Sequence, residues 1–288
     1  MKKKFIGMLV GISLLIFSGC ETNIFSTLDK VDANSQEAVS QSKYEAEEGL
    51  NSGDYATAIK NADVVIRSYE EQGKNSVNDF SDTETAERNE YIKFQTIKAE
   101  SYLGQGGVSA LDILDKIYQL NSTTPNTAIK RGTSDNNSST LINIVNGINS
   151  SDLKYAMEAF KKGLPSPEIL SPEERDNLKS TYQTAGITYG LNTVIIILNA
   201  LDTNGDSEID SSDFNASIIN NWNVHKDEII TSLNSTINYL AVALDSSDAV
   251  EVLDILRKIN TQLKKIPNNF TSDDLDKISK ILTGKEVY

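Results

Sequence analysis

The 288-residue chain contains one cysteine and one histidine, and this scarcity excludes several kinds of chemistry. A single cysteine cannot form a disulfide bond within the chain or build a cysteine-based zinc site. A nucleophile activated by a histidine base is not expected, because the sole histidine, His225, stands in a polar Asn-Val-His-Lys segment. We expect His225 to be solvated or to cap a helix, and we expect a protein that is not an enzyme.

Proline and glycine are also scarce, with five and sixteen residues. An all-β chain of this length needs many tight turns, which draw on glycine and proline. Apolar residues instead recur at helical spacing over most of the chain from Ser42 onwards. The sequence therefore predicts an all-α protein built from antiparallel helical hairpins.

Basic residues are outnumbered, with 27 Lys and Arg against 41 Asp and Glu, and the formal net charge is −14. Removal of residues 1–19 takes away three lysines and no acidic residue, which changes the net charge to −17. Nucleic-acid binding needs clustered Lys and Arg, but the densest basic spots are isolated pairs such as Lys161-Lys162 and Lys264-Lys265. We expect no nucleic-acid partner.

Residues 1–20 resemble the signal sequence of a bacterial lipoprotein. Three lysines precede an uncharged, mostly apolar stretch, residues 5–17, that is shorter than the ~20 residues of a membrane-spanning helix. The stretch 17–20, Phe-Ser-Gly-Cys, resembles a lipobox with Phe17 in place of the usual Leu. The resemblance implies cleavage after residue 19 and acylation of Cys20, which anchors the chain in a lipid bilayer. Glu21 follows, where Asp is the known inner-membrane retention signal, so the outer membrane or cell surface is favoured.

The mature chain divides into three parts by composition. Residues 20–41 are polar and lack sustained apolar periodicity, as in a tether between lipid and folded body. Residues 42–165 carry helical hairpins, and residues 166–288 form a C-terminal helical region.

The stretch 42–66 predicts two helices joined by a tight turn. Within it, Gly53-Asp54-Tyr55-x-x-Ala58-Ile59 is similar to the turn and second helix of a tetratricopeptide repeat, and Ala46 stands where that repeat has a small residue. Glu45 and Ser42 depart from the family, which usually has Leu and Trp there. The resemblance implies hairpins that stack into an array with a groove for a protein or peptide.

Two further segments resemble this hairpin, at uneven spacing, so insertions lie between the hairpins. One insertion is the Asn-, Ser- and Thr-rich stretch 121–140, which has the composition of a mobile loop. The alternative architecture is an irregular helical bundle, which has no continuous groove. The predicted apolar runs are 94–103 and 110–117 around a turn at 106–107, and 141–144 and 153–164 around a turn at 149–152.

The C-terminal region begins with Ser171-Pro172-Glu173-Glu174, which predicts a helix start with Ser as the cap, Pro at the first position and acids in the first turn. Residues 182–201 are strongly apolar and include the run Val194–Leu198, which indicates a helix buried on nearly all sides and not a membrane span. Helices near 226–244, 248–266 and 272–282 complete the predicted helical bundle.

Residues 202–213 resemble an EF-hand loop, and more closely the dockerin variant, which ends in Asp. Oxygens at loop positions 1, 3, 5, 7, 9 and 12 converge on calcium in that family, and an apolar residue, here Ile209, occupies position 8. Ser207 departs from the family, which has Gly there. A single loop outside the cytoplasm implies a structural clip with a Kd of about 10⁻⁴ to 10⁻³ M. The alternative is an acidic surface turn. The implied ligands are Asp202, Asn204, Asp206, the Glu208 carbonyl, Asp210 and Asp213.

Together these features predict a membrane-anchored lipoprotein of the cell envelope that acts as a non-enzymatic scaffold or adaptor for a protein or peptide. Two alternatives remain open at this point: a calcium-stabilised surface lipoprotein without a groove ligand, and an accessory lipoprotein of a transporter. A small-molecule carrier with a pocket around Val194–Leu198 is a further candidate, but that run is better explained as core.

Overall fold

The computed structural model describes residues 36–108, 148–204, 213–243 and 247–282. The signal with Cys20, the 121–140 stretch and Asp206, Glu208 and Asp210 lie outside the described residues. Within them the chain forms helices and no strand, so the all-α prediction is confirmed. The helices are α2 (Gln36–Ser52), α3 (Tyr55–Glu70), α4 (Thr85–Gln105), α7 (Ser150–Gly163), α8 (Pro172–Leu201), α9 (Ala216–Ala243), α10 (Ser247–Lys265) and α11 (Ser272–Leu282), with 3-10 helices η1 (Val77–Asp79) and η2 (Pro167–Ile169).

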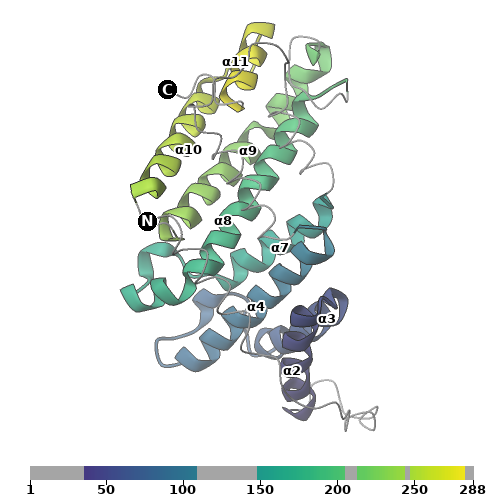
Figure 1. The fold of residues 1–288 in the computed structure, drawn as a ribbon, viewed down its shortest axis with the longest axis vertical. Helices are drawn as coiled ribbons and strands as arrows, with labels where there is room; N and C mark the ends of the chain where they lie inside the picture. The colour runs from purple at the N-terminus through teal and green to yellow at the C-terminus, as the bar shows by residue number, and fades with distance from the viewer. Residues whose placement is uncertain (1–35, 109–147, 205–212, 244–246, 283–288) are drawn as a thin grey trace, which may run out of the picture.

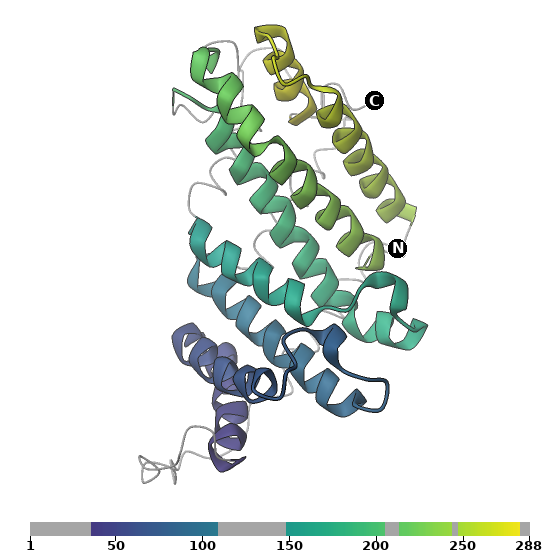
Figure 2. The same cartoon turned by 180° about the vertical axis from the view of Figure 1, so that it is seen from behind.

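The helices stack in chain order along the long axis of the molecule, from α2 and α3 at one end to α10 and α11 at the other (Figures 1 and 2). The most extensive contacts are within the pairs α2/α3, α4/α7 and α8/α9, with α3 also packed closely on α4. This arrangement is a series of antiparallel hairpins, as predicted.

The first hairpin follows from a few residues at its turn. Gly53 adopts φ +79, which favours glycine, and the Asp54 side chain accepts a hydrogen bond from the backbone N–H of Thr57 to cap α3. Ala46 of α2 and Ala58 of α3 are fully buried, as close helix packing requires. Helix α2 begins at Gln36, six residues before the predicted start, so helix occupies the last part of the stretch 20–41 that the sequence assigned to a tether. Val39 packs against the core and supports this earlier start.

In the second hairpin α4 packs on α7, although 44 residues separate the end of one from the start of the other. Gly163 makes this contact close, since a Cβ atom there would stand 2.4 Å from Cβ of Gln95. The predicted partner runs 110–117 and 141–144 lie outside the described residues. The contact of α4 with α7 was not predicted from the sequence, and the two predicted hairpins remain predictions.

Helix α8 opens with the predicted cap. The Ser171 hydroxyl accepts from the Glu174 backbone N–H, and the Glu174 carboxylate accepts from the Ser171 N–H at 3.0 Å, which is a capping box. Among the described residues α8 is the helix long and apolar enough to cross a membrane, but 72% of its most apolar window is buried inside the protein. The run Val194–Leu198 packs into the core, in agreement with the prediction.

Helix α9 begins at Ala216, ten residues before its predicted start near Lys226. The first turns contain several asparagines, which have low helix propensity and interrupt the helical spacing of apolar residues. Tertiary packing overrides that propensity, because Ile218 and Trp222 are fully buried against the C-terminal helices. Trp222 lies edge-on to Phe270 with ring centroids 6.0 Å apart, so it is a packing residue.

Candidate functional site

Ion pairs join helices that are not partners in a hairpin. They link α2 to α4 and α4 to α8, and in each case lower residue numbers on one helix meet lower numbers on the other. The three helices therefore run in the same direction and share one side of the stack. The pairs are Lys43–Glu90 at 2.6 Å, Glu47–Lys93 at 2.6 Å and Arg88–Glu174 at 3.1 Å.

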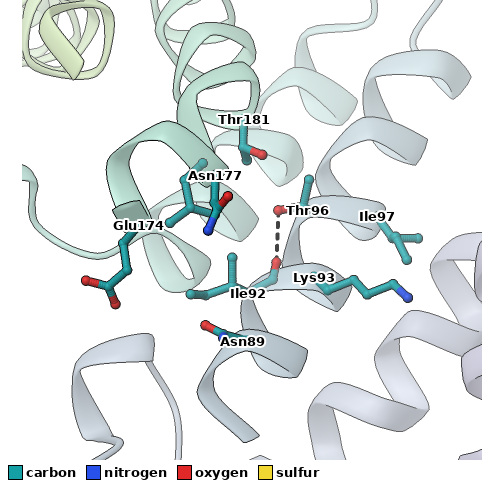
Figure 3. A pocket seen from close by; sticks show the side chains of 9 residues that line it. Asn89, Ile92, Lys93, Thr96, Ile97, Glu174, Asn177 and Thr181 are labelled. Atoms are coloured by element: carbon teal, nitrogen blue, oxygen red, sulfur yellow. Dashed lines mark hydrogen bonds between the residues drawn. The ribbon is translucent and has the colours of Figure 1, made fainter. Parts of the chain in front are cut away.

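A surface pocket of about 320 Å³ lies between α4 and α8 on this side. Side chains from the two helices face one another across it, and Glu174 and Lys93 lie at its opposite sides (Figure 3). The volume is at the lower end of the range for ligand sites, roughly 300–1,000 Å³. The lining residues are Asn89, Ile92, Lys93, Thr96 and Ile97 from α4 and Glu174, Asn177, Leu178 and Thr181 from α8.

Both charged residues of the pocket are engaged within the protein. Glu174 accepts from the backbone and the hydroxyl of Ser171 and pairs with Arg88. The Ser171 backbone hydrogen bond is the main cause that lowers the pKa of Glu174. Lys93 donates to Glu47 at 2.6 Å. Each charge in the pocket therefore has an opposite charge beside it.

The remaining polar groups of the pocket are neutral. The Thr96 hydroxyl donates to the Ile92 carbonyl at 2.8 Å (Figure 3). Within the described part of the chain, the side chains of Asn89, Asn177 and Thr181 make no hydrogen bond to protein. A carboxamide both donates and accepts, as does a hydroxyl. The pocket thus combines the apolar side chains of Ile92, Ile97 and Leu178 with neutral groups that can donate a hydrogen bond to a ligand or accept one from it.

The structure brings together the two ends of the predicted calcium loop. Asp202 is the C-cap of α8, and its N–H donates to the Leu198 carbonyl at 2.8 Å. Asp213 is fully buried, and its Oδ1 accepts from the backbone N–H of Thr203 at 2.7 Å and of Asn204 at 3.2 Å. The loop ends are held closed by these bonds.

Three of the six predicted ligands, Asp202, Asn204 and Asp213, are therefore placed side by side. The described residues, which omit 205–212, contain no group of three acidic, histidine or cysteine side chains that could hold a metal. The other three predicted ligands fall in that gap, so calcium binding stays a prediction. The EF-hand resemblance did not imply that Oδ1 of Asp213 would bind the loop backbone.

His225 lies on α9, with its Nδ1 3.3 Å from the Glu228 carboxylate one turn along. Its side chain is 39% exposed, which agrees with the prediction of a solvated residue.

Sequence reasoning missed the pocket between α4 and α8, because Asn89 and Asn177 lie far apart in the chain and in no motif. It also missed Glu100, a partly buried carboxyl on α4 whose pKa is raised by desolvation. No hydrogen bond or ion pair compensates Glu100 within the described residues.

Comparison with models of protein families, with curated proteins and with solved structures gives no match to this chain.

Proposed function

We propose that the mature chain is a lipoprotein of the cell envelope, anchored in a bilayer through acylated Cys20, that binds a protein or peptide as a non-enzymatic helical scaffold. The observation that carries this proposal is the pocket between α4 and α8, which exposes neutral hydrogen-bonding side chains beside apolar ones. The stacked hairpins support it, because alternate helices on one side of such a stack offer an extended surface to a partner. The outer membrane or cell surface is the proposed location.

The membrane anchor at Cys20 is proposed from residues 1–20 alone. Labelling of growing cells with a clickable palmitate analogue tests it, since the wild-type chain incorporates the label and the Cys20→Ser variant does not. Equal labelling of the two proteins would contradict anchoring at Cys20.

The scaffold function is tested by cross-linking in cells with calcium present, followed by purification and identification of attached proteins. A photo-reactive amino acid at Asn177, in the pocket, is expected to capture a stoichiometric envelope partner. The same amino acid at Asn223, an exposed residue of α9, is the matched control. Recovery of the chain alone from both positions would overturn the adaptor function.

That outcome would favour the second candidate, a calcium-stabilised surface lipoprotein without a groove ligand. The observation behind it is the buried closure of the loop ends around Asp213, which gives the α8–α9 turn a structural role. Protease added to intact cells would cleave a surface protein and spare one that faces the periplasm. A captured transporter component would instead identify the accessory role.

A further inference from the structure

The two charged residues that line the α4–α8 pocket, Lys93 and Glu174, each lie beside an opposite charge. Two cationic residues, Lys93 and Arg88, each pair with a carboxylate, Glu47 and Glu174 respectively. A ligand carboxylate would compete with Glu47 for Lys93, and a ligand ammonium would compete with Arg88 for Glu174. Lys93 keeps further N–H donors, but a ligand carboxylate that approaches it also meets the like charge of Glu47, and a ligand ammonium that approaches Glu174 meets the like charge of Arg88.

The polar side chains of the pocket that make no hydrogen bond within the described protein are neutral, and they suit a neutral ligand. Asn89 and Asn177 stand on facing helices, and Thr181 lies one turn beyond Asn177 (Figure 3). Each of these side chains both donates and accepts, which matches a peptide main chain, whose N–H and C=O groups alternate. Ile92 lies between the two asparagines (Figure 3), and Leu178 also lines the pocket; both match an aliphatic side chain.

The dimensions of the pocket indicate a short segment. The lining residues of α8 run from Glu174 to Thr181, a rise of roughly 10 Å along the helix. An extended chain covers this distance in three to four residues at about 3.3 Å each.

We infer that the α4–α8 pocket selects an uncharged, extended peptide segment with an aliphatic side chain at its centre, bonded through its main chain by Asn89 and Asn177. This inference rests on the proposed scaffold function and adds the chemistry of the segment that is bound. A carboxylate or an ammonium group on either side of the aliphatic residue weakens binding.

Three capped heptapeptides of equal length test the inference: acetyl-GSALASG-amide and its analogues GEALAEG and GKALAKG. Each is titrated into ¹⁵N-labelled mature chain, and side-chain amide signals of Asn89 and Asn177 are followed. The neutral peptide is expected to bind with a millimolar Kd, typical of so few contacts, and to shift both signals. The charged analogues are expected to bind at least threefold more weakly.

Two variants separate binding from general effects of charge. Asn89→Ala with Asn177→Ala is expected to weaken the neutral peptide about tenfold, while Asn223→Ala on α9 leaves its Kd unchanged. Glu47→Gln leaves Lys93 without its partner and is expected to reverse the preference, so that the glutamate peptide binds better than the neutral one. A merely structural role of Glu47 would not change this order.

Several results would overturn the inference: saturable binding of no peptide, equal or tighter binding of a charged analogue to the unmodified chain, or unchanged binding by the double asparagine variant. A partner captured in cells that binds equally well to the double variant would overturn this inference and leave the scaffold function standing. If the unmodified chain captures no partner in cells and binds no peptide, the scaffold function and this inference are both overturned.

Discussion

The backbone N–H of Thr203 donates a hydrogen bond of 2.7 Å to Oδ1 of Asp213, and the Thr203 hydroxyl donates one of the same length to the Asp213 carbonyl. These bonds join the end of α8 to the residues that precede α9 through the protein's own atoms. Closure of the turn by these bonds can therefore be measured in EDTA, separately from any effect of calcium.

The Asp213→Ala variant is expected to be less stable than the wild type by about 2–3 kcal/mol, even in EDTA. The change leaves the N–H groups of Thr203 and Asn204 without the buried carboxylate that accepts from them. Urea unfolding followed by circular dichroism measures the difference. The control is Asp273→Ala, an exposed acid in the first turn of α11, which should stay within about 0.5 kcal/mol. Equal stability of the two variants would show that Asp213 does not close the turn.

Calcium is expected to stabilise the wild-type protein and not the Asp202→Ala, Asp206→Ala double variant. With a Kd between about 10⁻⁴ and 10⁻³ M, 10 mM calcium adds about 1.4–2.7 kcal/mol to the free energy of unfolding. The readout is the difference in melting temperature between calcium and EDTA for each protein, so any calcium-independent effect of the substitutions cancels. An unchanged melting shift in the double variant would reject the predicted site, and magnesium at the same concentration controls for ionic strength.

Gly186 and Gly190 lie one turn apart on α8, and alanine is expected to have opposite effects at the two positions. A Cβ at Gly186 would stand 2.7 Å from Cδ2 of Leu240 and 3.2 Å from its backbone nitrogen, so Gly186→Ala forces α9 away and costs about 1–3 kcal/mol. A Cβ at Gly190 meets Cγ2 of Thr236 at 3.5 Å, an ordinary contact, so Gly190→Ala adds about 0.5–1 kcal/mol through helix propensity. Urea midpoints of the two variants test the sign, and changes in the same direction would contradict the close packing of α8 and α9.

Glu100 is expected to make the protein less stable as the pH rises. Burial raises the pKa of its carboxyl above the ordinary value of 4.5, so above that pH the unfolded chain releases this proton before the folded protein does. The free energy of unfolding then falls as the pH rises from 4.5 through the folded-state pKa. Glu100→Gln keeps the shape and removes the charge, so it should raise stability at pH 7 more than at pH 4. Glu87→Gln, at an exposed position of the same helix, is the control; equal effects of the two variants at both pH values would reject the buried charge.

The sequence predicted those elements whose structure depends on interactions between neighbouring residues. The capping box of Ser171 and Glu174, the turn at Gly53-Asp54 and the buried run Val194–Leu198 all lie where expected. These features depend on residues within a few positions of one another, and their hydrogen bonds or burial follow from helix geometry.

Features that depend on distant residues could not be predicted in this way. The pairing of α4 with α7 spans the undescribed stretch 109–147, and the pocket joins Asn89 to Asn177. The early start of α9 depends on the burial of Trp222 against Phe270, which outweighs the weak helix propensity of the neighbouring asparagines. In each case tertiary packing decides, and one sequence holds no record of it.

Helix α8 contributes to every hydrophobic cluster of the described structure. Leu178 packs against the cluster of α2, α3 and α4, Tyr182 to Ile195 belong to the central one, and Ile196 to Leu201 enter the C-terminal one. With 30 residues, α8 is about 45 Å long. Displacement of this helix would remove core contacts from each of the clusters. Because the hydrophobic clusters share this helix, we expect the described hairpins to unfold together and not as independent modules. The pocket and the loop ends, which lie near opposite ends of α8, are then lost in one transition.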